Sequence, residues 1–106
     1  MFFELRQYRI KDGRMEEWVK FMEKEIIPYQ VAKGMVILGS FVGDEEKNLY
    51  IWIRRFESES EKDRLYKAVY EDSHWTKNLS PKVGELMHRD KIVVTRMIAT
   101  GRSVIQ

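Results

Sequence analysis

The sequence contains no cysteine, only two prolines and no long apolar run. Without cysteine, the chain can form no disulfide, no thiolate nucleophile and no cysteine-ligated zinc or iron–sulfur site. No stretch approaches the roughly 18 apolar residues that a membrane span needs. Charged Glu4 and Arg6 follow the N-terminus too soon for the apolar region of a signal peptide. We therefore expect a cytoplasmic protein without a membrane span.

The chain also lacks a charge excess of one sign, because 19 basic and 17 acidic side chains leave a net charge of only +2. These charges are interspersed, so the chain has no basic stripe of the kind that binds nucleic acid. We expect no nucleic-acid partner. A chain of 106 residues is one domain, and a domain of this size buries only about two-thirds of its unfolded surface. Association with a second copy would add materially to its stability.

The first third of the chain is typical of a strand followed by a helix. Residues 1–10 are rich in Phe, Leu, Tyr and Ile, and residues 13–33 change to helical spacing. In the second segment the apolar side chains recur every three or four residues, at Met15, Trp18, Val19, Met22, Ile26 and Tyr29. We expect Asp12 to cap this helix and Pro28 to kink or restart it.

The rest of the chain predicts a hairpin, a second helical region and a last strand. Two apolar runs, residues 35–43 and 49–53, flank a polar turn. Ser58 and Glu61 fit a capping box, and short helical pieces then lead to a strand over residues 91–99. The order β-α-β-β-α-β predicts an α+β, ferredoxin-like domain, in which a four-stranded antiparallel sheet carries its helices on one face.

Alternate strand residues form two sets that point to opposite faces of the sheet. One set, Leu49, Ile51 and Ile53, is aliphatic, and we expect it to face the helices. The other set is aromatic or charged, and comprises Arg6, Tyr8, Tyr50, Trp52, Arg54 and Phe56. No helix remains to cover the second face, and monomers rarely expose so large an apolar patch. We therefore expect a homodimer that forms through this open sheet face.

Short segments along nearly the whole chain carry a family resemblance. They are, in order, Glu4-Leu5-Arg6-Gln7-Tyr8, Gly13-Arg14-Met15, Gly39-Ser40-Phe41, Phe56-Glu57-Ser58, Arg64, and Asp72 with Trp75. With these segments the chain resembles the NIPSNAP family, which belongs to the dimeric α/β-barrel superfamily. It resembles a bacterial member that consists of a single domain. Many members have a Trp-x-Tyr pair where this chain has Arg54 and Phe56. The resemblance implies that two sheets pair face to face into a barrel, and it transfers no catalytic residue.

The candidate ligand site is the set of arginines and aromatics assigned to the open face: Arg6, Tyr8, Tyr50, Trp52 and Arg54. Aromatic rings and two guanidinium groups suit a flat, anionic organic ligand, which they would hold by stacking and bidentate hydrogen bonds. A structural alternative stays open. In that alternative Glu4 pairs with one of the arginines, and the aromatics simply pack an interface.

The two histidines are further candidates. His74 lies beside Asp72, and an imidazole near a carboxylate can act as a general base or contact a ligand. The alternative is a surface histidine that precedes a packed Trp75. Haem-dependent relatives in the superfamily use a histidine as the haem ligand, so the resemblance makes His74 and His88 candidates for a haem ligand. Their spacing suits no other metal site, and we expect no metal and no further cofactor.

Three classes of function follow from these observations. The first is a homodimer that binds a small aromatic or anionic molecule, either in the barrel or in a cavity between the sheet and its helices. The second is an enzyme, cofactor-free or haem-recruiting, like the monooxygenase relatives. The third is a protein-interaction module without catalysis. We rank ligand binding first.

Overall fold

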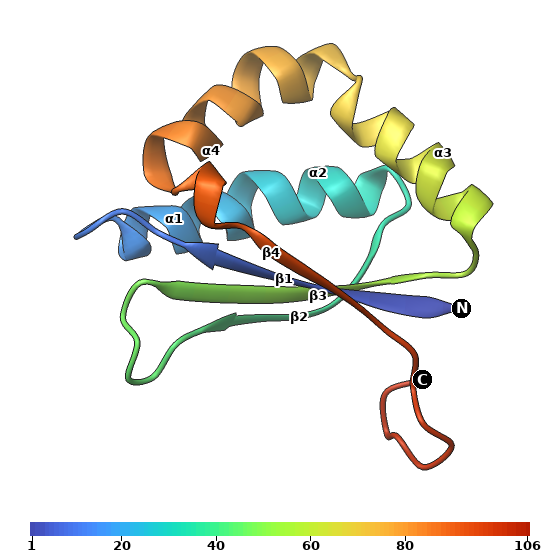
Figure 1. Cartoon of the computed structure of the whole chain (residues 1–106). Coiled ribbons are helices and arrows are strands. Elements are labelled where there is room, and N and C mark those ends of the chain that lie inside the picture. Colours follow the sequence, from blue (N-terminus) through green and yellow to red (C-terminus); the bar gives the residue numbers. More distant parts are fainter.

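A computed structural model describes all 106 residues of the chain. Four antiparallel strands form one sheet in the order β2-β3-β1-β4, and the helices lie on one of its faces (Figure 1). The strands are β1 (Phe2–Arg9), β2 (Val36–Val42), β3 (Leu49–Phe56) and β4 (Val93–Met97). The predicted β-α-β-β-α-β order and the ferredoxin-like α+β fold are confirmed. No helix is both long enough and apolar enough to span a membrane.

The first helical region runs from α1 (Met15–Phe21) through a π-helical segment, η1 (Met22–Ile26), into α2 (Ile27–Ala32). Pro28 stands in the first turn of α2 and has no N–H. Just before it, the backbone hydrogen bonds change from the i→i−4 pattern of an α-helix to the i→i−5 pattern of a π-helix. The Ile27 N–H, for example, donates to the Met22 carbonyl. The predicted Asp12 cap is wrong. Gly13, with a φ of 74°, turns the chain there, and Arg14 occupies the cap position without a side-chain hydrogen bond.

The second helical region forms an arch above the sheet (Figure 1). It comprises α3 (Glu59–Tyr70), a π-helical segment η2 (His74–Leu79) and α4 (Ser80–Leu86), and the 3-10 turn η3 (Arg89–Lys91) leads into β4. The predicted Ser58 cap is confirmed, because the Glu61 N–H donates to the Ser58 Oγ at 3.1 Å. The arch holds the inward side chains of α3, η2 and α4 over one part of the sheet.

The sheet faces are the reverse of the sequence prediction. The aromatic and charged set faces the helices: Glu4 pairs with Arg54, Arg6 with Trp52, and Tyr8 with Tyr50 across β1 and β3. All of these except the half-buried Arg6 are buried. Large side chains fill the space below the arch, where Tyr8, Tyr50 and Trp52 pack with helix residues in one core cluster. The aliphatic set lies on the other face because a period of two defines two faces without saying which one is covered.

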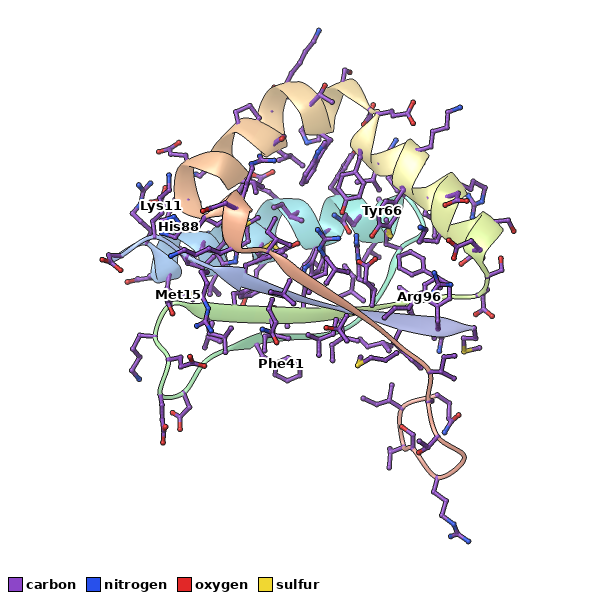
Figure 2. All side chains as sticks on the ribbon, in the orientation of Figure 1. Lys11, Met15, Phe41, Tyr66, His88 and Arg96 are labelled. Carbon is purple, nitrogen blue, oxygen red and sulfur yellow. The ribbon has the colours of Figure 1, made fainter.

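The open face is nevertheless apolar. Leu5, Ile51 and Ile53 lie on it half-buried, and Phe41 in β2 is 55% exposed there. Figure 2 shows Phe41 on the side of the sheet away from the helices, and Tyr66 on the helix side. Beyond β4, the C-terminal segment projects from the sheet, with Ile98 80% exposed (Figure 1). The prediction of an uncovered apolar face is therefore confirmed, although with different residues.

Candidate functional site

A cavity of about 280 Å³ lies between the sheet and the helices. The sheet contributes Arg6, Tyr8 and Trp52 to its wall, and the first helical region contributes Trp18, Met22, Ile26 and Gln30. The arch adds Tyr66, Tyr70, Trp75 and Val83, and the segment after α4 adds Met87, Arg89 and Ile92. Eleven of these fourteen residues are hydrophobic, so the cavity is an apolar chamber with a few polar groups.

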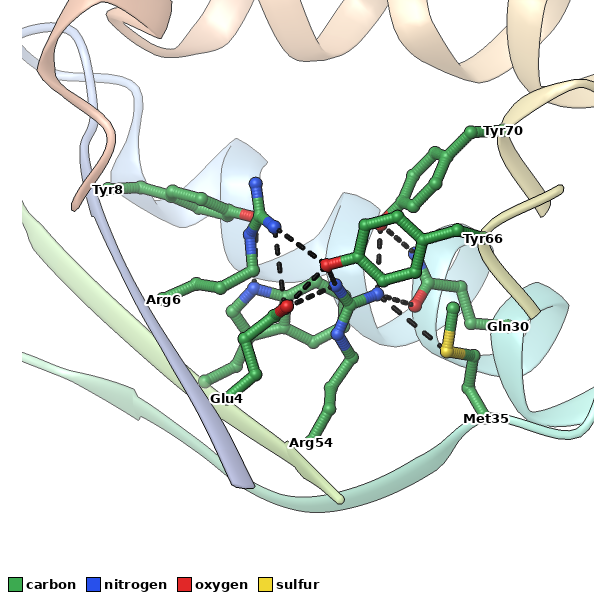
Figure 3. Close-up of polar contacts among 9 residues, drawn as sticks. Glu4, Arg6, Tyr8, Gln30, Met35, Arg54, Tyr66 and Tyr70 are labelled. Carbon is green, nitrogen blue, oxygen red and sulfur yellow. Dashed lines mark hydrogen bonds and ion pairs between the residues drawn. The ribbon is translucent and has the colours of Figure 1, made fainter. Parts of the chain in front are cut away.

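The polar end of the cavity is built around Arg54, whose side chain is fully buried (Figure 3). Its Nη2 donates to the Glu4 Oε1 at 2.6 Å, and its Nη1 donates to the Gln30 Oε1 and the Tyr70 hydroxyl, both at 2.9 Å. Its Nη2 also donates to the Tyr66 hydroxyl at 3.0 Å. A buried guanidinium needs such partners, because an unpaired charge away from water is costly. Residues of β1, α2, β3 and α3 are thereby held together.

Glu4 is a fully engaged carboxylate. Its Oε1 accepts from Arg54 and from Arg6, and its Oε2 accepts a short hydrogen bond from the Tyr66 hydroxyl. Burial by itself would raise the pKa of Glu4, but the charge of Arg54 and the hydrogen bonds from Tyr66 and Arg54 hold that pKa below its ordinary value. Glu4 is therefore ionised, and both of its oxygens are occupied.

Tyr8 links this network to the cavity. Its hydroxyl accepts from the Arg6 Nε at 2.9 Å and from the Trp52 Nε1 at 3.0 Å. Burial raises the pKa of Tyr8 above its ordinary value, and the positive charge of Arg6 only partly opposes this effect. Tyr8 is therefore a neutral phenol. Arg6 itself is half-buried, with 17% of its side chain exposed, and it lies at the cavity wall.

Arg6, Tyr8 and Trp52 are the predicted site residues that line the cavity, and Arg54 lies among them as the centre of the network. Tyr50 does not line the cavity: its ring packs on Trp18 with centroids 5.8 Å apart, and its hydroxyl contacts the Ser40 Oγ at 2.5 Å. The structural alternative holds in one respect, since Glu4 does pair with Arg54. The aromatics, however, lie inside the subunit and not at an interface.

His74 does not join the site. It is exposed at the start of η2, where its Nδ1 lies 2.9 Å from the Asn78 amide nitrogen and its ring meets the edge of Tyr29. His88 also lies outside the cavity wall. Nowhere do three His, Asp or Glu side chains gather as metal ligands would. The prediction that His74 shares a site with the arginines therefore has no support in the geometry.

Sequence analysis missed the contribution of the helices. Gln30 in α2 and the tyrosines Tyr66 and Tyr70 in α3 supply the polar partners of Arg54. Tyr66 and Tyr70 are spaced i, i+4 and therefore share a helix face next to the apolar Leu65 and Val69. That spacing was a usable signal, because a tyrosine pair on an inward stripe brings two hydroxyl groups into a core and each needs a partner.

Comparison with solved structures identifies relatives over the full length of the chain. A NIPSNAP family protein from Agrobacterium tumefaciens is 24% identical, with a TM-score of 0.89, and the match covers 99% of this chain and 98% of the other. A second protein from the same organism is 25% identical over 100% of both chains, with a TM-score of 0.90. An antibiotic biosynthesis monooxygenase shares the fold at 18% identity, with a TM-score of 0.68 over 94% of this chain and 99% of the other.

Among curated protein sequences, none matches this chain significantly. The NIPSNAP family model matches residues 3–99, which include all the strands and helices described above except the first residue of β1. Because this match covers most of the chain, it shows that the chain belongs to the NIPSNAP family.

Proposed function

We propose that this protein is a homodimer that binds a small, flat organic anion in the cavity between sheet and helices. One observation carries the proposal: an apolar, aromatic-walled cavity of about 280 Å³ ends at a buried cluster of charge. Arg6 and Arg54 are cations and Glu4 is an anion, so this end holds one positive charge in excess. Beside largely apolar walls, such an excess favours a negatively charged guest.

The dimensions and walls of the cavity narrow the class of ligand. Drug-sized molecules occupy pockets of about 300–1,000 Å³, so a cavity of about 280 Å³ suits a smaller one. The rings of Trp18, Trp52 and Trp75 lie in its wall, which favours a planar, aromatic body. Arg89 is the exposed residue of the wall and therefore marks its solvent side. A second cation there favours the approach of an anion.

The open sheet face supports the dimer. Ile51 and Ile53 are only half-buried, Phe41 is 55% exposed, and no helix of the chain lies on this side (Figure 1). An apolar sheet face that stays in contact with water is unusual in a monomer. A second copy offers a face of the same chemistry, and a standard interface buries about 800 Å² on each partner.

Tryptophan fluorescence tests ligand binding directly, because all three tryptophans of the chain line the cavity. We expect saturable quenching by small aromatic carboxylates, such as benzoate and naphthoate, and at least about tenfold weaker binding to Arg6→Met. Tyr50→Phe is the matched control, since its hydroxyl contacts Ser40 outside the cavity.

Native mass spectrometry of protein from its own host reports the oligomer and any retained ligand together. A monomer at micromolar concentration, or no quenching by any member of the panel, contradicts the respective half of the proposal.

A further inference from the structure

The hydroxyl of Tyr8 has no acceptor left in the protein for its own proton. A phenol oxygen has one proton to donate and two lone pairs that accept. Arg6 Nε and Trp52 Nε1 donate to this oxygen at 2.9 Å and 3.0 Å, which uses both lone pairs. Tyr8 is 6% exposed and lines the cavity, so the free O–H can be satisfied only from the cavity side.

Other groups at the same end of the cavity are also unused donors. The Tyr70 hydroxyl accepts from Arg54 at 2.9 Å and from the Gln30 amide at 3.4 Å, so its proton is free as well. Arg6 uses its Nε and Nη1 in hydrogen bonds to Tyr8, Glu4 and Tyr66, whereas its Nη2 makes none. Elsewhere in the cavity wall Trp18, 1% exposed, also has a buried indole N–H without a partner.

Each side-chain acceptor at this end, by contrast, already receives at least one hydrogen bond from the protein. Both oxygens of Glu4 receive hydrogen bonds from Arg54, Arg6 or Tyr66. The Gln30 Oε1 accepts from Arg54 at 2.9 Å. The Tyr66 hydroxyl donates to Glu4 and accepts from Arg54 at 3.0 Å. A ligand group that arrives here therefore meets several unused donors, one of them a cation, whereas each side-chain oxygen already accepts from the protein.

From this imbalance, and on the basis of the proposed function, we propose that the polar end of the cavity binds ligands through an oxyanion. A carboxylate, phenolate or enolate oxygen would accept from the Tyr8 O–H and the Arg6 Nη2, with Tyr70 as a further donor. A neutral phenol would instead bring a proton, and every side-chain oxygen that could accept it here already accepts from the protein. The oxyanion form of a phenol or enol is therefore preferred, and its proton leaves to solvent because Glu4 is already engaged.

A chromophoric phenol can be used to measure the preference of the site for phenolate over phenol, and the measurement assumes no enzymatic reaction. Para-nitrophenol absorbs in the visible range only as its phenolate, so a pH titration with excess protein reports the protonation state of the bound probe. We expect the midpoint of the bound probe to lie at least about one pH unit below that of the free probe, which is a tenfold preference for the anion, about 1.4 kcal/mol. Quenching of tryptophan fluorescence establishes separately that the probe is in the cavity.

Variants assign the effect to the two main donors. Tyr8→Phe removes the free O–H, and Arg6→Met removes the cation; each should return the probe midpoint most of the way to its free value. In Tyr50→Phe the midpoint of the bound probe should equal that in the wild type, since Tyr50 does not line the cavity. Arg6→Gln also removes the positive charge but keeps a polar side chain, and it serves if Arg6→Met does not fold.

The outcomes separate this inference from the function on which it rests. If the probe quenches the tryptophans but its midpoint does not move, the oxyanion preference is wrong while ligand binding stands. If the midpoint moves equally in Tyr8→Phe, Arg6→Met and the wild type, these donors do not cause it and the assignment is overturned. If neither the probe nor the carboxylates quench at all, both proposals fail.

Discussion

Arg54 and Glu4 face each other directly across β3 and β1, and the arginine Nη2 lies 2.6 Å from the carboxylate Oε1 beneath the helix layer. The arginine side chain is 0% exposed and that of the glutamate 8%. Two such charges are retained in a core only when both are well paired, because the desolvation of each is costly. This pair ties the β1–β3 ladder to α2 and α3 through the groups that surround Arg54.

We expect Glu4→Gln to destabilise the protein by about 3–5 kcal/mol, because it leaves the Arg54 guanidinium buried without a counter-charge. Urea unfolding followed by circular dichroism measures this change. The double variant Glu4→Leu with Arg54→Met removes both charges and should recover most of the loss. If Glu4→Gln unfolds within about 1 kcal/mol of the wild type, the pair does not carry the role assigned to it.

Because of the Glu4 carboxylate, we expect the free energy of unfolding to depend on pH in the acidic range. The folded-state pKa of Glu4 lies below 4.5, the ordinary value that applies to the unfolded chain. The stabilisation is therefore complete above about pH 4.5 and is lost as the pH falls through the folded-state pKa. Unfolding free energies measured in urea from neutral pH downward should fall in this window. In Glu4→Gln that part of the decline should disappear, and an unchanged slope in the variant would contradict the assignment.

The buried tyrosines predict a loss of stability at the alkaline end. Burial raises the pKa of Tyr8 and Tyr66 above the ordinary value of 10.0, and raises that of Tyr50 to about 12. The unfolded chain loses these phenol protons near pH 10 while the folded chain keeps them, so the unfolding free energy falls as the pH rises above 10. Tyrosinate absorbance of the folded protein should appear later than in the urea-unfolded protein. Coincident titration curves would show that these hydroxyls are open to solvent.

The open sheet face predicts a substitution that should break the proposed dimer. We expect Ile53→Lys to place a charge in the interface and shift the protein to monomer, with at least about a hundredfold weaker association. Sedimentation velocity measures this shift. Val31→Lys in α2 is the matched control, because Val31 is an aliphatic residue that is already 53% exposed. Retention of the dimer in Ile53→Lys would place the interface elsewhere.

The order of the elements was readable because each one has a local cause. The helical spacing from Met15 to Tyr29, the Ser58 cap and the polar turn before Leu49 act over a few residues. Pro28 showed where the first helix would be perturbed, although its effect is a π-helical segment and not a break. The Asp12 cap failed because Gly13 takes a positive φ and moves the helix start beyond the reach of that side chain.

The site was only partly readable, because it joins residues that are distant in the chain. Arg6, Tyr8, Trp52 and Arg54 were identifiable as a set from their alternation along two strands. Their hydrogen-bond partners on the helices, Gln30, Tyr66 and Tyr70, lie 12 to 60 positions away in the chain. No local pattern specifies which helix residue lies above a given strand residue, since that depends on how the helices pack.

The sequence by itself therefore determined the order of strands and helices, the two alternating sets of the sheet and the family to which the chain is similar. Only the tertiary structure decided which set is covered. Both sets are apolar enough to be buried, but only the set with Glu4 and Arg54 needs polar partners in the core, and Gln30, Tyr66 and Tyr70 of the helices supply them. Arg6, Tyr8 and Trp52 therefore line a cavity within the subunit, whereas their alternation alone had placed them at an interface.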